Sequence, residues 1–135
     1  MYSHILIPTL LDGSREFDEA KKVAEVLLDA DGRLTVLHVI EPLPLNAAPY
    51  LPAGFEENSR SAIKAKLGAL TSNIDGAQSA IEDGSAGRSI AEWSEKNGVD
   101  CIIMQSHQPA FTDIFLGSTA AWVVRHAKCA VHVLR

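Results

Sequence analysis

The residues Gly117, Ser118 and Thr119 open an apolar stretch rich in alanine and valine near the end of the chain. If a helix begins here, its first backbone N–H groups have no partner within the helix, and the positive end of the helix dipole lies beside them. Both properties favour a bound phosphate, and the Ser118 and Thr119 hydroxyls add further donors. N-capping by Ser118 explains the same residues, since most helices need such a cap. Taken alone, the triplet favours the cap over a phosphate cradle.

His107 precedes this triplet, in a His-Gln-Pro segment that the pattern predicts to be a loop. Its imidazole could donate a hydrogen bond to a phosphate or a ribose, although most loop histidines have no such role. No acid or second histidine lies near it at the spacing of metal ligands, so we expect no metal site. The chain also lacks a Gly-x-Ser-x-Gly elbow, a GxxxxGK[ST] loop and a GxGxxG turn. We therefore assign no catalytic residue.

The elements that must position these residues are visible as periodic patterns. Five runs rich in apolar and β-branched residues predict strands: 4–10, 33–41, 77–83, 100–106 and 130–135. Between them, apolar residues that recur every three or four positions predict amphipathic helices: about 15–31, 55–72, 86–97 and 118–127. Ser14 is the expected N-cap of the first helix, and Gly32 is its expected stop signal.

Residues 42–54 hold four of the six prolines and no charged residue, which excludes a regular helix or a central strand there. Such a segment could be a lid over a ligand, an oligomer contact or an extended surface connection.

Strands that alternate with helices imply right-handed crossovers and a parallel sheet covered on both faces. The sequence therefore predicts a three-layer α/β fold, and its length suits a single domain over residues 1–135. In such sheets ligands bind beyond the carboxyl ends of the strands, where the strand order reverses. We expect a ligand at the loops that follow the first and fourth strands.

The composition of the chain indicates which classes of ligand and which cellular compartment to expect. A net charge of -5 argues against nucleic acid but allows a small anion, because backbone amides hold an anion without net positive charge. No apolar run approaches the roughly 20 residues of a membrane span, and the start of the chain has no signal-peptide pattern. Cys101 and Cys129 lack Cys-x-x-Cys spacing, which favours buried reduced thiols. We expect a cytoplasmic protein with no membrane partner.

Four segments together resemble the universal stress protein family: ILIPTLLDGS, LTVLHVIEPLP, EDGSAGRSIAEWSEKNGVDCIIMQSHQP and FLGSTAAWVVRHAKCAVHVLR. The resemblance covers essentially the whole chain, and its C-terminal part is the most specific. It implies an open five-stranded parallel sheet of order 3-2-1-4-5 with helices on both faces. It also implies a homodimer formed through the last strand, Ala130–Arg135, whose exposed edge offers unpaired backbone groups.

Many members of the family bind ATP through Gly-x-x-Gly, nine residues, and then Gly-Ser or Gly-Thr. In this chain Gln105 and Gln108 stand where the first two glycines would be, the spacer is one residue shorter, and Gly117-Ser118 is present. The intervening Ser-His-Gln-Pro at 106–109 is similar to a Ser-His-x-Pro variant of single-domain bacterial members, which is compatible with a nucleotide.

The resemblance implies an ATP site at the sheet edge between the first and fourth strands. Adenine would lie against backbone groups of Thr9 and Val39, among a first set of residues: Pro8, Thr9, Leu10, Val39 and Met104. Ribose and phosphates would lie among a second set: Gln105, His107, Gln108 and the amides of Gly117, Ser118 and Thr119. Leu10 stands where the family's ATP binders carry an aspartate, which weakens selection of adenine more than the hold on phosphate. A Mg or Mn ion would be coordinated by the phosphates, without a dedicated protein ligand.

The expected function is that of a cytoplasmic stress-response homodimer that binds ATP as a sensor or switch. Any hydrolysis would be slow, because no base or arginine is evidently positioned for it. The altered glycine motif and the missing aspartate also support an alternative, a nucleotide-free dimeric protein-interaction module of the same family.

Overall fold

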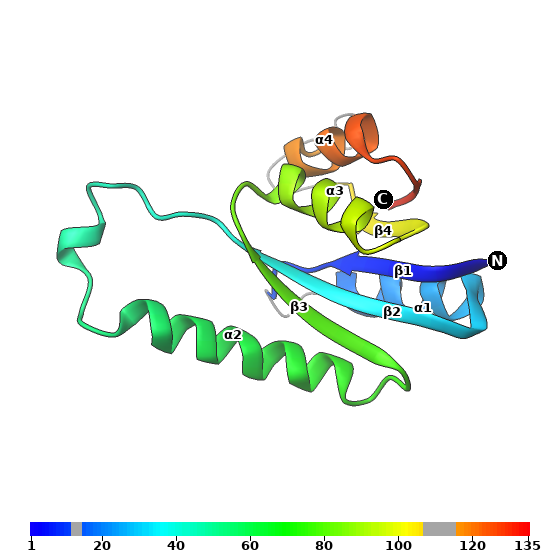
Figure 1. Cartoon of the computed structure of the whole chain (residues 1–135), viewed down its shortest axis with the longest axis horizontal. Helices are drawn as coiled ribbons and strands as arrows, with labels where there is room; N and C mark the ends of the chain where they lie inside the picture. The colour runs from blue at the N-terminus through cyan, green and yellow to red at the C-terminus, as the bar shows by residue number, and fades with distance from the viewer. Residues whose placement is uncertain (12–14, 107–115) are drawn as a thin grey trace.

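Strands and helices alternate along the computed structural model, which describes residues 1–11, 15–106 and 116–135 (Figure 1). The strands are β1 (Tyr2–Pro8), β2 (Leu28–Ile40), β3 (Ala77–Asp83), β4 (Cys101–Gln105) and β5 (Ala130–Leu134). The helices are α1 (Glu16–Leu27), α2 (Phe55–Thr71), α3 (Ala86–Lys96) and α4 (Ser118–His126), with a short 3-10 helix at Ala48–Tyr50. This alternation confirms the predicted α/β class.

The strands form one parallel sheet in the order β3-β2-β1-β4-β5, which confirms the expected topology. The order reverses between β1 and β4, because the chain proceeds to opposite sides of the sheet from these two central strands. They pair at Ile5 with Cys101 and at Leu6 with Ile102. Beyond these pairs their carboxyl ends part, at the place where such folds bind ligands.

The helices cover both faces of the sheet, α1 and α2 on one face and α3 and α4 on the other (Figure 1). Side chains alternate along each strand, so each face has its own apolar core. Ile5 and Ile7 of β1 pack with Ala20 of α1. Leu6 packs with Ile90 of α3 and Val123 of α4. The two cores hold the central strands in place and thereby fix the loops at their ends.

The first crossover differs from the sequence prediction. Leu28 already has extended backbone angles (φ -77°, ψ 136°) and pairs with Tyr2 of β1. Gly32, predicted to stop the helix, lies inside β2 instead. The chain enters the sheet early because β1 offers backbone partners that no local pattern reveals. Arg15 is the N-cap of α1, and the predicted cap Ser14 lies outside the described residues.

The first strand also ends earlier than the predicted range 4–10. Its last ladder bond runs from the amide of Thr9 to the carbonyl of Leu37 at 2.9 Å. Leu11 then takes a φ of 59°, a left-handed conformation that cannot continue a strand. Leu10 therefore lies beyond the sheet and is 71% exposed.

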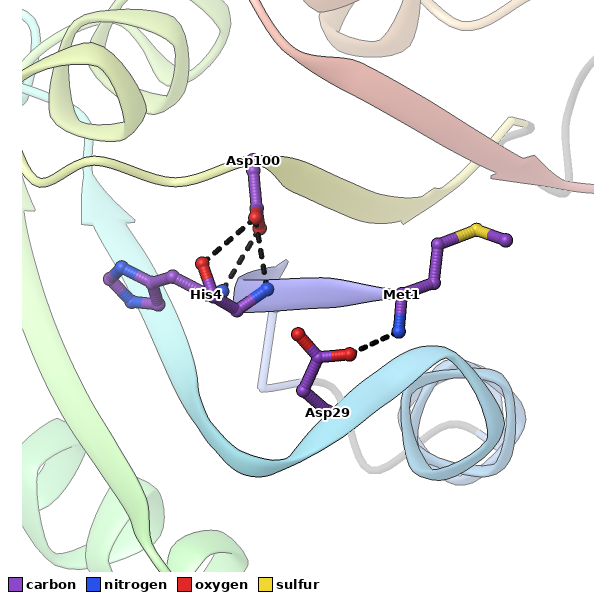
Figure 2. Close-up of polar contacts among 5 residues, drawn as sticks. Met1, His4, Asp29 and Asp100 are labelled. Atoms are coloured by element: carbon purple, nitrogen blue, oxygen red, sulfur yellow. Dashed lines mark hydrogen bonds and ion pairs between the residues drawn. The ribbon is translucent and has the colours of Figure 1, made fainter.

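A group of polar contacts fastens β1 at the amino end of the sheet (Figure 2). One carboxylate oxygen of Asp100 accepts hydrogen bonds from the amide and the hydroxyl of Ser3, and the other accepts from the amide of His4, all at 2.9 Å. The N-terminal amine of Met1 pairs with Asp29 of β2. The contacts of Asp100 extend the short pairing between β1 and β4 toward the start of the chain, and the contact of Met1 ties the same end to β2.

The buried ring of His4 lies between the sheet and α3. Its Nε2 lies 2.9 Å from the Thr35 hydroxyl, and its Nδ1 lies 3.1 Å from the carbonyl of Asn97. The ring also meets Trp93 edge to face, with centroids 6.1 Å apart. Burial lowers the pKa of His4, and the nearby charge of Arg33 lowers it further, against the opposing effects of Asn97 and Asp100. The neutral imidazole is the form that suits this place.

The proline-rich residues 42–54 run away from the sheet before α2 returns to it (Figure 1). Leu45 and Tyr50 in this segment are 95% and 87% exposed. The helix α2 buries Leu67, and Arg60 holds both carboxylate oxygens of Asp83 at 2.6 and 2.7 Å. No helix in the described ranges is long and apolar enough to cross a membrane.

Candidate functional site

A cavity of about 530 Å³ opens at the carboxyl ends of β1, β2 and β4. This volume falls within the range of about 300–1,000 Å³ that is typical of small-molecule sites. The cavity is lined by every predicted site residue that the structure describes: Pro8, Thr9, Leu10, Val39, Met104, Gln105, Gly117, Ser118 and Thr119. The remaining two, His107 and Gln108, lie outside the described residues. The fold therefore brings residues from four separate parts of the chain to one cavity.

The start of α4 forms one part of the cavity wall. Gly117 is the N-cap, with a φ of -59° and a ψ of 156°, and no side chain caps the helix. N-capping by Ser118, the alternative that the sequence allows, is therefore wrong. The first intrahelical bond runs from the amide of Ala121 to the carbonyl of Gly117. The amides of Ser118 and Thr119 consequently lack a partner within the helix and lie at its positive end.

The amide of Gly117 is occupied within the protein. It donates to the carbonyl oxygen of Ser106 at 2.6 Å, so the prediction that it faces a phosphate is wrong. Ser106 in turn donates its amide to the carbonyl of Leu134 at 2.8 Å. A Cβ on Gly117 would lie 3.2 Å from the Ser106 oxygen, which explains why this close approach favours glycine.

Ser106 adds a donor that the sequence analysis did not assign. The residue lines the cavity and is 5% exposed. Its hydroxyl makes no hydrogen bond to any of the described residues. No fully buried side-chain oxygen of the described residues lacks a partner, so this hydroxyl is accessible from the cavity, where an oxygen of a ligand can accept its hydrogen bond. With the amides of Ser118 and Thr119, it forms a group of donors suited to an oxyanion.

Main-chain groups of β2 face the cavity on the other side. The amide of Thr9 is bound to Leu37, and its carbonyl accepts from Nδ1 of His38 at 2.8 Å. The Thr9 amide is therefore not free for adenine, whereas its carbonyl oxygen keeps a second lone pair that can accept from a ligand. Peptide groups alternate in direction along a strand, so the N–H and C=O of Val39 point to the same side as those of Leu37. Because β1 has already ended at Pro8, Val39 presents one donor and one acceptor at the sheet edge.

The cavity wall also contains two charged residues that the sequence does not predict to lie there. Glu16 is the first residue of α1, and its carbonyl accepts a hydrogen bond from Nε2 of Gln105 at 3.3 Å. Lys66 lies on α2, which the sequence places far from any other site residue. Both stand on amphipathic helices, where charged residues usually form a solvated face. Only the packing of the helices on the sheet brings them to the cavity.

The described residues give little support for covalent or metal chemistry. Burial raises the pKa of the Cys101 thiol to about 11, so it is protonated at neutral pH. Cys101 and Cys129 are both free. Within residues 1–11, 15–106 and 116–135, no three His, Cys, Asp or Glu side chains are grouped to hold a metal ion.

Comparison with known proteins identifies the family. A sequence profile of the universal stress protein family matches residues 1–135. The chain belongs to the universal stress protein family. Universal stress protein G of Shigella flexneri is 30% identical to it over 142 residues, with 100% of both chains covered.

Solved structures agree with this assignment. A hypothetical protein whose biochemical function was assigned from its structure shares the fold with a TM-score of 0.81 and 25% identity, over 99% of this universal stress protein and 96% of the other chain. A universal stress protein in complex with cAMP has a TM-score of 0.63 at 18% identity, with 99% and 97% of the chains covered. The Archaeoglobus fulgidus universal stress protein in complex with dAMP has a TM-score of 0.66 at 11% identity, with 99% and 98% covered. Some structural relatives therefore bind adenine nucleotides.

Proposed function

We propose that this universal stress protein binds ATP in the cavity and acts as a nucleotide-dependent sensor or switch in the cytoplasm. The observation that carries the proposal is the group of donors that line the cavity, namely the Ser106 hydroxyl and the amides of Ser118 and Thr119. Backbone amides at a helix start hold a phosphate without a cationic side chain, which fits the net charge of -5.

The rest of the cavity suits an adenine ring. Pro8 and Met104 supply apolar surface, and Val39 offers an amide and a carbonyl side by side. Adenine carries an acceptor and a donor on neighbouring atoms, so the Val39 peptide groups complement it. The relatives that bind cAMP and dAMP support an adenine nucleotide as the ligand class. Mg or Mn would accompany the phosphates.

The proposal is tested with protein purified without added nucleotide. Acid extraction and chromatography would detect a nucleotide that copurifies, and a thermal-shift assay with millimolar Mg-ATP would detect binding. A saturating ligand at about 100 times its Kd stabilises the folded state by about 2.7 kcal/mol. Absence of nucleotide together with an unchanged melting temperature would overturn the proposal.

A matched pair of variants locates the site. Ser118→Glu places a carboxylate at the helix start and should abolish the shift by repelling the phosphates. Val124→Glu adds the same charge further along α4, at a residue that is 48% exposed, and should leave the shift unchanged. Equal shifts in the two variants would exclude the start of α4 as the phosphate site.

The nucleotide-free interaction module is the second candidate function. It is favoured by the exposure of Leu45 and Tyr50 on residues 42–54, none of which lines the described part of the cavity. These side chains offer apolar surface to a protein partner. The module predicts no copurified nucleotide and no thermal shift with Mg-ATP.

We also propose that the protein is a homodimer joined through β5. Within the described residues β5 pairs with β4 on one side, and its other edge carries no strand. Ala130 and His132 are exposed there, and Val131 and Val133 are half-buried. An open edge of this kind is normally covered by a second strand or protected by charges.

A further inference from the structure

The cavity continues from the sheet edge onto the second face of the sheet. Leu37 and Met104 in its lining belong to the core under α3 and α4, whereas Ile7 and Ile103 belong to the core under α1. Residues from opposite faces can line one cavity only if it wraps around the carboxyl ends of the strands. We call the part on the second face the α1–α2 lobe, lined by Ile7, Phe17, Ala20, Ala69, Leu70 and Ile103.

The α1–α2 lobe is unsuited to the proposed nucleotide. Its six lining side chains are aliphatic or aromatic, so they offer no hydrogen bond to a base, a ribose or a phosphate. The donors of Ser106, Ser118 and Thr119 lie at the start of α4, which covers the opposite face (Figure 1). A nucleotide held at the start of α4 therefore leaves the lobe without an assigned ligand.

The lobe persists because α1 and α2 each pack mainly on the sheet. The first helix rests on β1, β4 and β2, and the second rests on β3 and β2. Ala20 on α1 and Ala69 on α2 present small side chains to the cavity. Small side chains at these two positions leave room in the cavity for a slender apolar group.

Lys66 supplies a charge at this lobe. It lies on the exposed side of α2, one turn from Leu70, and has no ion pair with any described residue. The hydrocarbon stem of a lysine lies along apolar surface while its ammonium stays in water. Glu16, the other charged residue of the cavity wall, lies at the start of α1 beside Gln105. An anionic headgroup is therefore favoured at Lys66 and disfavoured at Glu16.

We propose that the α1–α2 lobe binds the chain of a medium-length fatty acid, with the carboxylate at Lys66. Burial of the chain supplies most of the affinity, and the ion pair orients the ligand. Each buried methylene contributes enough to raise affinity about fourfold. An ion pair at an exposed lysine adds a factor of about 2 to 5.

The test is a calorimetric titration of the full chain with hexanoate, octanoate and decanoate below their micelle concentrations. We expect saturable binding that strengthens about fourfold per methylene until the lobe is full. Octanoate should bind better than octanol by a factor of about 2 to 5. Absence of saturable binding, or an affinity that does not change with chain length, would overturn the proposal.

Two pairs of variants on α2 show where the chain binds. Ala69→Trp places a large ring in the lobe and should abolish binding, whereas Ala65→Trp, one turn away and outside the lining, should not. Lys66→Met should remove the preference for octanoate over octanol, whereas Lys64→Met should preserve it. Equal behaviour within either pair would contradict the assignment to this lobe.

A final titration separates this inference from the nucleotide proposal, on which it does not depend. Octanoate should bind with the same affinity in the presence and absence of Mg-ATP, and Ser118→Glu should leave it unchanged. If octanoate and ATP instead compete and Ala69→Trp has no effect, the fatty acid occupies the nucleotide region and the lobe assignment is wrong.

Discussion

The amide of Gly117 donates to the carbonyl oxygen of Ser106 at 2.6 Å, which fastens the start of α4 to the end of β4. This bond removes one donor from the cavity but fixes where the next two, on Ser118 and Thr119, can lie. The same segment carries the Ser106 hydroxyl, and Ser106 lines the cavity. A single backbone contact thus sets the spacing among the donors to which we assign phosphate binding.

Gly117→Ala is expected to weaken nucleotide binding. The new Cβ would lie 3.2 Å from the Ser106 oxygen, so the two segments must separate by a few tenths of an ångström. The loss corresponds to one weakened hydrogen bond, or roughly a fivefold rise in Kd. Calorimetric titration with Mg-ATP measures it, and Ser118→Ala, which retains the amide, is the control that should change Kd less.

Gly87→Ala is expected to destabilise the fold by about 1–3 kcal/mol, the usual cost of overpacking. A Cβ at Gly87 would lie 2.7 Å from Cβ of Trp122, so alanine must push α3 and α4 apart. Trp122 is 37% exposed, because one part of it packs on Gly87 while another faces solvent. Urea denaturation measures the free energy of unfolding.

Gly68→Ala is expected to raise the stability of the fold, in contrast to the same substitution at Gly87. A Cβ at Gly68, within α2, would meet no atom within 4 Å. Alanine there should stabilise the protein by about 0.5–1 kcal/mol, because it removes the conformational entropy of glycine from the unfolded chain. Equal effects of the two alanines would show that helix propensity, and not contact with Trp122, decides the outcome at Gly87.

His4 is expected to make stability depend on pH on the acid side of neutrality. Burial lowers its pKa below the ordinary value of 6.5 in the folded state. As pH falls below about 6.5, the unfolded chain therefore binds a proton that the folded chain does not, and the free energy of unfolding decreases. The slope for one such group is at most about 1.4 kcal/mol per pH unit and ends at the folded-state pKa.

Urea midpoints between pH 8 and pH 5 check this dependence. His4→Gln retains a hydrogen-bonding side chain but does not titrate, so its stability should vary less with pH in this interval. Stability that falls equally steeply in both proteins would assign the effect to other groups.

Val133→Pro is expected to convert the proposed dimer into a folded monomer. Ser106 donates to the carbonyl of Leu134, so Leu134 and His132 direct their peptide groups toward β4, and Val133 directs its own outward. Proline at 133 removes an outward donor without breaking the sheet, since edge positions tolerate proline. Sedimentation equilibrium reports the mass.

His132→Pro is the matched control, because it removes a peptide N–H that faces β4. It should lower stability by about 1–3 kcal/mol, the usual cost of leaving a buried backbone acceptor without its hydrogen bond. A Val133→Pro protein that remains dimeric would place the interface elsewhere.

Much of the fold could be predicted from the sequence, because strong local patterns agreed with the tertiary structure. The range 77–83 matches β3, and the predicted start at Ser118 matches α4. The boundary after α1 was wrong because Gly32 was interpreted as a stop signal. In the structure, pairing between Leu28 and Tyr2 decides that boundary, and such pairing depends on residues distant in the sequence.

The grouping of the candidate site residues could be predicted from the sequence, but their hydrogen bonds could not. Family resemblance placed Val39, Met104 and Ser118 together, and all three line the cavity. The occupied amide of Gly117 could not be foreseen, because it depends on how closely α4 approaches β4. Lys66 was missed because its position over the cavity follows from the path of α2 across the sheet.

The polar contacts of Asp100 lie at the opposite end of the strands from the cavity (Figure 2). Anchoring and recognition are thus assigned to separate ends of one sheet. Substitutions at the carboxyl ends of the strands can therefore accumulate without breaking the hydrogen bonds of Asp100 at the amino ends. Relatives that share this scaffold are therefore free to differ in what they bind.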